Sequence, residues 1–173
     1  MRILTFIGFY LLFQFASLAH AARTNTLTLC TNQETPLFSC NIKKKTLSVC
    51  AAKNISKTEG YLKYRFGKSE KIDFSYPYVK EHPSKFFRFH HGGSAKASED
   101  QLSFTLNNFS YTVFVERAAF DFNGSGVFVK SNGKQIAYLP CNEDRPSPDN
   151  LYSLRDFKLE SAEYEVFNTD LHK

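Results

Sequence analysis

The four cysteines are the residues best suited to chemistry, and their number suggests oxidation to two disulfides. Cys30, Cys40, Cys50 and Cys141 all follow an apolar N-terminal leader. An even count in an exported chain is typical of a disulfide framework. No C-x-x-C motif occurs and the spacing differs from that of paired zinc ligands, so the sequence argues against a thiol oxidoreductase and against a zinc site.

Strand alternation limits how these cysteines can pair. Cys40 lies on the apolar face of one expected strand, whereas Cys50 lies on the opposite side of the next strand from the apolar Val49. Cys40 and Cys50 then point to opposite faces of a hairpin and cannot bond to each other. Two pairings remain, Cys30 with Cys40 and Cys50 with Cys141, or Cys30 with Cys50 and Cys40 with Cys141. We favour the first.

Histidine, serine and glycine form no recognisable catalytic or ligand-binding motif. His90 and His91 are adjacent, and neighbours on a strand point to opposite faces, so both rarely bind one metal ion. Gly124-Ser125-Gly126 lacks the G-x-S-x-G pattern of a nucleophile elbow, and Gly92-Gly93-Ser94 lacks the lysine of a phosphate-binding loop. We therefore expect no catalytic residue, no metal site and no cofactor.

Carboxylates are plentiful, and two adjacent pairs are candidate partner-binding residues. Glu99-Asp100 and Glu143-Asp144 could contact a basic surface of a partner protein. An enzyme that uses two carboxylates on cell-wall or carbohydrate substrates would need a pair roughly 5 to 10 Å apart in a cleft. The sequence indicates no such pair, so we expect a protein that is not an enzyme.

The first 22 residues have the pattern of a secretory signal peptide. Arg2 precedes an apolar run over residues 3–15, and Ala19-His20-Ala21 supplies the small residues of a cleavage site. The run is shorter than the roughly 20 residues of a membrane span. We expect residues 1–22 to be removed and residues 23–173 to form one disulfide-stabilised β domain without a membrane span.

The charge is mildly basic and scattered. The full chain carries a net charge of +5, and Arg2 is the only charged residue of the leader, which leaves +4 on the mature part. The single basic triplet, Lys43-Lys44-Lys45, is expected to be a solvated hairpin turn. So weak a bias argues against nucleic acid as a partner. A protein partner in the envelope or an anionic envelope polymer fits better.

Alternation of apolar and polar side chains is the dominant signal along the chain. It is clearest over residues 61–76, on either side of an expected turn near Gly67. A hairpin that sets Phe66 opposite Ile72 on the apolar face also sets Arg65 opposite Asp73 on the polar face. Apolar pairing and charge pairing thus predict the same register.

Two further hairpins are predicted at asparagine turns. Asn107-Asn108 joins two alternating segments and aligns Leu102 with Val113. Asn132-Gly133 is the strongest short hairpin signal in the chain, and it aligns Val127 with Tyr138.

The second of these ribbons is apolar on both sides. Phe128 and Leu139 fall on the face opposite the one that the alternation assigns to the core. We therefore expect this ribbon to be covered on both faces.

The remaining elements complete an all-β domain. Further strands are expected at Thr26–Cys30, Pro36–Ile42, Thr46–Ala51, Lys85–His90 and Lys158–Phe167. A short helix is expected from Ser147-Pro148-Asp149 through about Asp156, and a mobile loop over residues 92–100. About ten short strands with one late helix predict an antiparallel sandwich or partly open barrel built of hairpins, with one short C-terminal helix.

A series of short motifs resembles a group of small exported bacterial proteins of unassigned function. The motifs are Leu37-Phe38-Ser39-Cys40, Leu47-Ser48-Val49-Cys50-Ala51, Gly60-Tyr61-Leu62-Lys63-Tyr64-Arg65-Phe66-Gly67, Ile72 to Pro77, Gly126-Val127-Phe128-Val129, Asn132-Gly133-Lys134 and Leu139-Pro140-Cys141. The resemblance implies a periplasmic or secreted location and brings no catalytic residues. The group's glycine-rich stretch corresponds here to residues 92–98, which are longer and more charged.

These observations favour a periplasmic binding or inhibitory protein that protects the envelope against a wall-degrading enzyme or a toxin. Two alternatives remain. One is the carboxylate-dependent cell-wall or carbohydrate enzyme, and the other is a structural or adhesive component of the envelope. Each alternative predicts an observation that a soluble inhibitor does not. The enzyme needs a carboxylate pair in a cleft, and the structural or adhesive component should self-associate through an unpaired strand.

Overall fold

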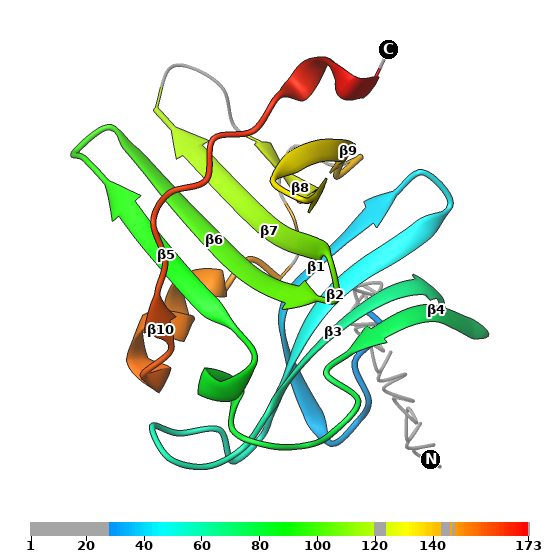
Figure 1. Ribbon diagram of the computed structural model, residues 1–173. Helices are drawn as coiled ribbons and strands as arrows, with labels where there is room; N and C mark the ends of the chain where they lie inside the picture. The colour runs from blue at the N-terminus through cyan, green and yellow to red at the C-terminus, as the bar shows by residue number, and fades with distance from the viewer. Residues whose placement is uncertain (1–27, 120–123, 143–145, 147, 173) are drawn as a thin grey trace, which may run out of the picture.

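Alternating side chains fold this chain into two antiparallel sheets that pack face to face. The computed structural model describes residues 28–119, 124–142, 146 and 148–172, so the expected signal peptide lies outside the described residues (Figure 1). The strands are β1 (Glu34–Ile42), β2 (Lys45–Ala52), β3 (Leu62–Lys68), β4 (Lys71–Tyr76), β5 (Arg88–Gly93), β6 (Ala97–Leu106), β7 (Phe109–Ala118), β8 (Gly124–Ser131), β9 (Lys134–Pro140) and β10 (Glu160–Ser161).

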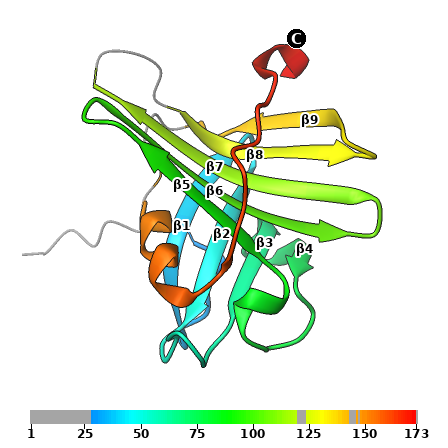
Figure 2. The same cartoon turned by 60° about the vertical axis from the view of Figure 1, so that its left-hand side comes forward.

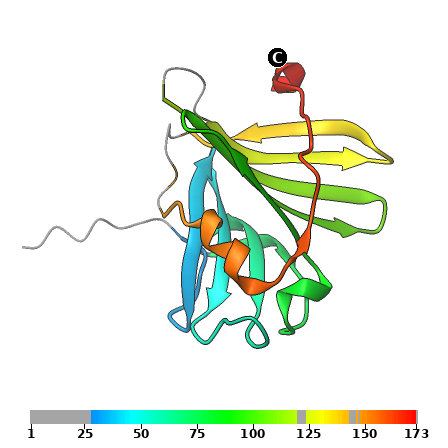
Figure 3. The ribbon, with the colours of Figure 1, turned by 90° about the vertical axis from the view of Figure 1, so that its left-hand side faces the viewer.

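The small sheet has the strand order β1-β2-β3-β4, and the large sheet has the order β10-β5-β6-β7-β8-β9. All pairs are antiparallel except β10 with β5, which is parallel. The strands of the two sheets cross at a steep angle (Figure 3). The prediction of an antiparallel all-β fold is confirmed, and of its two alternatives, sandwich or partly open barrel, the described residues form the sandwich.

The core lies between the inner faces of the sheets. Phe38 and Leu62 of the small sheet and Phe104 and Val113 of the large sheet belong to one buried cluster. Tyr76 stacks on Phe104 with ring centroids 4.4 Å apart, so aromatic rings from both sheets interlock. This packing explains the aromatic content of a chain that contains no tryptophan.

Short 3₁₀ helices cap the sandwich. They are η1 (Pro83–Lys85), η2 (Leu151–Phe157) and η3 (Thr169–His172). The helix expected near residue 150 is η2, which lies beside the sandwich, between β9 and β10 in chain order (Figure 2). Its Leu151 and Leu154 are buried in the core. Its expected cap, Ser147, lies outside the described residues. In the described part of the chain, no helix combines the length and the apolar character that crossing a bilayer requires.

The two asparagine turns form where they were predicted, but only one register is right. Leu102 pairs with Val113, as expected from a turn in which Asn107 has φ 54°. At the other turn, a bulge beside Val129 shifts the pairing, so that Tyr138 lies opposite Phe128 instead of Val127. The shift puts Tyr138 on the outer face of the large sheet.

The predicted register of the β3–β4 hairpin is wrong by two residues. Phe66 pairs with Phe74 and Arg65 with Ser75, because the turn is tighter than expected, with Lys68 opposite Lys71, and a bulge between Phe66 and Gly67 shifts the pairing by one further residue. A side chain at Gly67 would lie 2.6 Å from the backbone of Asp73 and Lys71, so only glycine fits there.

Other expected boundaries also differ. Residues 92–100 are largely strand, not a mobile loop, because a hydrogen bond from Ser94 N–H to the carbonyl of Ala97 closes a tight turn. The segment expected at Lys85–His90 begins as η1, and residues 28–30 form no strand. Only two residues of the expected strand Lys158–Phe167 pair with a neighbour.

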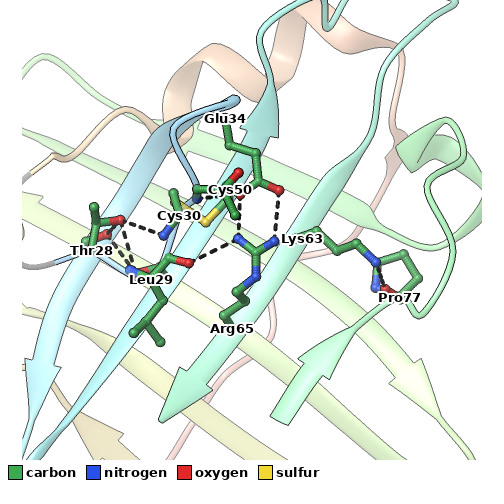
Figure 4. Close-up of polar contacts among 11 residues, drawn as sticks. Thr28, Leu29, Cys30, Glu34, Cys50, Lys63, Arg65 and Pro77 are labelled. Atoms are coloured by element: carbon green, nitrogen blue, oxygen red, sulfur yellow. Dashed lines mark hydrogen bonds and ion pairs between the residues drawn. A yellow bond between two sulfur atoms is a disulfide. The ribbon is translucent and has the colours of Figure 1, made fainter. Parts of the chain in front are cut away.

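The disulfides are Cys30–Cys50 and Cys40–Cys141, and no free cysteine remains. The argument that Cys40 and Cys50 cannot bond is confirmed, but the favoured pairing of Cys30 with Cys40 and Cys50 with Cys141 is wrong. The reason is the path of residues 28–30, which cross the outer face of the small sheet, toward which Cys50 points (Figure 4). Cys40 faces inward and reaches the residue that follows β9.

A charged pair is buried under this N-terminal segment. Arg65 donates to both carboxylate oxygens of Glu34, at 2.6 and 2.8 Å, and to the carbonyl of Leu29 (Figure 4). The Glu34 side chain is 1% exposed. Nearby, burial lowers the pKa of Lys63, whose ammonium donates to the carbonyls of Pro77 and Val79. The outer face of the small sheet is therefore covered and tied down covalently.

The Glu34 carboxylate should make folding stability depend on acid. Burial alone raises the pKa of Glu34, but hydrogen bonds from Arg65 and Thr31 outweigh it and lower the pKa from 4.5 to about 2. A lowered pKa gives stability that is complete above the unfolded value and is lost as the pH falls through the folded value. We expect a loss of about 3 kcal/mol between about pH 5 and about pH 2.

Urea unfolding across this pH range measures that loss. Glu34→Gln is the control, since it removes the titrating group and should flatten the pH dependence by this amount. Equal slopes for the two proteins would contradict the assignment.

Candidate functional site

The outer face of the large sheet carries the candidate site. Successive residues of these strands alternate between the core and the outer face. The residues that point outward are Glu99, Gln101, Ser103 and Thr105 on β6, Ser110, Thr112 and Phe114 on β7, Phe128 and Lys130 on β8, and Gln135 and Tyr138 on β9. The set mixes hydroxyls, amides and large aromatic rings. Outer faces of sandwiches are usually polar and solvated, so the aromatic members need a cover.

That cover is an extended segment, residues 162–168, which we call the strap. It leaves β10 and runs across the outer face of the large sheet toward β9 (Figures 1 and 2). The main-chain N–H of Ala162 donates to the carbonyl of Phe89, the Asn168 side chain accepts from the N–H of Asp170, and side chains of the sheet make further polar contacts with the strap.

Two glutamines bind the main chain of the strap in the same way. Gln101 donates to the carbonyl of Glu165 at 2.9 Å and accepts from its N–H at 2.8 Å. Gln135 donates to the carbonyl of Asn168 and accepts from its N–H, both at 2.7 Å. A side-chain amide that makes both bonds reproduces the contacts of a neighbouring strand. This recognition depends on the peptide backbone and not on the identity of the residue held.

Side chains of the strap add two specific contacts. Glu165 accepts from Lys130 Nζ at 2.6 Å and from the hydroxyl of Thr112 at 3.2 Å. Phe167 packs on the outer aromatic cluster, defined as Phe114, Phe128 and Tyr138, with ring centroids at 4.5, 5.0 and 5.6 Å respectively. The strap thus supplies a carboxylate and an aromatic ring, two residues apart, to matching groups on the sheet.

The upstream part of the strap meets the sheet at a polar corner. The Tyr164 hydroxyl donates to Glu116 at 2.7 Å. Burial raises the pKa of Tyr164, and the hydrogen bond to Glu116 raises it further. His90 contacts the carbonyl of Ala162 through Nδ1 and Glu99 through Nε2. Glu99, a predicted partner-binding residue, therefore does lie at the edge of this site.

A groove of about 620 Å³ opens beside the strap, on the same face. Its floor is formed by the hydroxyl-bearing residues Ser103, Thr105 and Ser110, which are held on β6 and β7. Its walls include three carboxylates, and they are Glu160, Glu163 and Glu165. Because the floor is built on paired strands, its polar groups are fixed before any ligand arrives.

The carboxylates of the groove are placed for charge pairing. Glu160 pairs with Arg88 at 2.9 Å, and Glu165 pairs with Lys130. A general acid in a glycosidase needs surroundings that disfavour its charged form, such as an apolar pocket or a second carboxylate. Two of the three wall carboxylates instead contact a cation.

Asp100, the neighbour of Glu99, points to the opposite face and is fully buried. It accepts from His91 Nδ1 at 2.8 Å and from Arg117 at 2.7 Å, and its side chain is 0% exposed. Although burial disfavours the charge of Arg117, hydrogen bonds from it to Asp149 and Asp100 raise its pKa. Asp149 also bridges to β1, so the network joins the two sheets. No exposed carboxylate of Asp100 is left for a partner.

His91 and Asp100 are hydrogen-bonded in the way that the histidine base and the aspartate of a catalytic triad are, but a triad also needs a nucleophile. Within the described residues, no serine, threonine or cysteine bonds the other ring nitrogen of His91. No three His, Cys, Asp or Glu side chains in the described ranges gather closely enough to hold a metal ion. The other two predicted partner-binding residues, Glu143 and Asp144, lie outside the described residues.

Sequence reasoning missed the residues that build the site. Gln101, Gln135 and Phe167 have no motif that marks them. The one usable signal was the apolar outer face expected for the β8–β9 ribbon, and the prediction that this ribbon is covered on both sides is confirmed by the strap on Phe128. The placement of Leu139 on that outer face is wrong, because the bulge beside Val129 sets Leu139 opposite Val127 and against the core.

Comparison of the chain with protein-family models, with curated proteins and with solved structures finds no match.

Proposed function

We propose that this chain is a periplasmic binding or inhibitory protein that holds a segment of a partner protein on the outer face of its large sheet. The observation that carries this proposal is the groove beside the strap, whose hydroxyl floor is preformed on β6 and β7. Ligand sites are concave and largely preformed, with a few polar groups that fix orientation. Serine and threonine hydroxyls both donate and accept, so they suit the peptide groups of an inserted loop.

The ion pairs of the groove walls favour binding over catalysis. Charged groups that are already paired can exchange partners with a ligand, whereas a hydrolase requires one carboxyl group that stays protonated. The partner we propose is a wall-degrading enzyme or a toxin of the envelope. Two disulfides are typical of proteins in oxidising compartments, and this supports a location outside the cytosol.

Capture of the partner by the oxidised mature chain, immobilised and exposed to an envelope extract, tests the proposal. We expect one protein to be retained in roughly equimolar amount. Ser103→Arg fills the groove and should reduce the retained amount at least about tenfold, which corresponds to about 1.4 kcal/mol of binding energy.

Ser69→Arg is the matched control, because the same change on the exposed β3–β4 turn leaves the groove intact. Its capture should equal that of the unchanged chain. Retention of nothing above background, or equal retention by Ser103→Arg, would reject this function.

A further inference from the structure

The strap is attached to the sandwich differently from the segment that covers the other outer face. Residues 28–30 cover the small sheet and are tied to β2 by the Cys30–Cys50 disulfide. The strap has no such tie. Regular strand pairing ends with β10, just before the strap, and only the bond of Ala162 N–H to the carbonyl of Phe89 continues it. Segments held by so few main-chain bonds open locally at a small fraction of the cost of global unfolding.

The face beneath the strap is equipped to hold an extended peptide in general. Gln101 and Gln135 bind only main-chain groups, as described above. Between them, Val166 is 76% exposed and points away, so the middle position carries no selectivity. An extended chain alternates its side chains, which lets the residues on either side of that position face the sheet.

The two inward positions define the chemistry of a ligand. Lys130 and Thr112 meet a carboxylate, and the outer aromatic cluster meets an aromatic ring two residues later. Phe114 and Phe128 are each 0% exposed with Phe167 packed against them. Without a ring at that position, three large aromatic side chains would face water, which is costly.

We propose that the strap is a displaceable occupant of a peptide-binding site, and that the site takes an extended partner segment of the form carboxylate, any residue, aromatic. This inference rests on the proposed function and names the partner chemistry for the same face. Ser110 of the groove floor and Thr112 of the strap site lie two residues apart on the outer face of β7, so a bound segment would continue onto the groove floor, while the lining residues Ala162, Glu163 and Glu165 leave with the strap. In the free chain the strap competes with the partner, so the apparent affinity equals the intrinsic affinity multiplied by the fraction of molecules in which the strap is undocked.

A labelled peptide of residues 162–170, titrated into the full mature chain, tests the exchange. The double variant Glu165→Ala with Phe167→Ala weakens the strap and leaves the sheet unchanged, so it should bind the peptide at least about tenfold more tightly than the unchanged chain. Adding Gln101→Ala to this variant should weaken peptide binding again by about tenfold, since one main-chain clamp is lost. A peptide with alanine at the positions of Glu165 and Phe167 should not bind.

Hydrogen exchange measured on the unchanged chain tests displacement of the strap without any substitution. Saturating peptide should speed exchange of the Glu165 and Asn168 amides, while the amide of Val113 in the sheet interior stays as slow as before. Equal peptide affinity for the unchanged chain and the double variant, with both folded by near-ultraviolet circular dichroism, would overturn the proposal. So would strap amides that do not respond to peptide. Either result leaves the Ser103→Arg test of the proposed function unaffected.

Discussion

Replacing Cys40 and Cys141 together by alanine is expected to lower the free energy of unfolding by about 5 kcal/mol. The bond closes a loop with a sequence separation of 101 residues, and in the chain-entropy description a longer loop gives a larger stabilisation. The pair also joins the two sheets, because Cys40 lies on β1 and Cys141 follows β9. Urea unfolding of the oxidised chain and of the variant measures the difference.

The Cys30–Cys50 pair is the internal control for this prediction. Its sequence separation is only 20 residues, so the same description predicts a cost of about 3 kcal/mol for its removal. The variant without Cys40–Cys141 should therefore unfold at a lower urea concentration than the variant without Cys30–Cys50. Midpoints that match the unchanged chain, or the reverse order, would show that chain entropy does not govern these bonds.

Arg65→Met is expected to cost about 3 to 5 kcal/mol. The substitution keeps the apolar stem but leaves the Glu34 carboxylate buried and without its cation. Breaking a buried pair by removal of one partner is costly because the remaining charge is still desolvated. Equilibrium unfolding near neutral pH gives the value directly.

A second variant and a control distinguish the cost of leaving a buried charge unpaired from the cost of losing a salt bridge. Replacing Glu34 and Arg65 together by methionine should cost less than Arg65→Met alone, because no uncompensated charge remains. Arg88→Met breaks a pair whose side chains are both 62% exposed, and it should cost less than about 1 kcal/mol. Equal losses from Arg65→Met and Arg88→Met would contradict the argument.

Much of the sandwich could be predicted because alternation is a local property of the chain. The turn at Asn107-Asn108 and the pairing of Leu102 with Val113 follow from neighbouring residues alone. Bulges are different, because one inserted residue changes the partner of every residue beyond it. The error beside Val129 arises in this way, and the error in the β3–β4 hairpin combines the bulge at Gly67 with a turn that is tighter than expected.

The disulfide pairing shows the limit of the same reasoning. Local alternation correctly excluded a bond between Cys40 and Cys50. The choice between the two remaining pairings depended on which face Cys30 crosses, and that path is set by long-range contacts of Leu29 with Ser48 and Arg65. No pattern within a few residues of Cys30 carries this information.

The candidate site was beyond sequence reasoning for a similar reason. Gln101 and Gln135 look like ordinary solvent-facing residues of polar strand faces. Their partners, Glu165 and Asn168, lie 64 and 33 residues away, the first within the strand expected at Lys158–Phe167 and the second just beyond it. Charge alone singled out Glu99 and Asp100 in the sequence, but only the structure shows that Glu99 contacts His90 beside the strap whereas Asp100 is buried and paired with Arg117.

The two disulfides also decide how the molecule responds to a pulling force. The covalent ring closed by Cys30 and Cys50 overlaps the ring closed by Cys40 and Cys141, so the chain between Cys30 and Cys141 cannot be drawn out as a single thread while both bonds are oxidised. The strap lies outside both rings. A motor or protease that pulls on the C-terminal side would first peel off the strap, and it would have to extract η2 with its buried Leu151 and Leu154 before the force reached the Cys40–Cys141 bond.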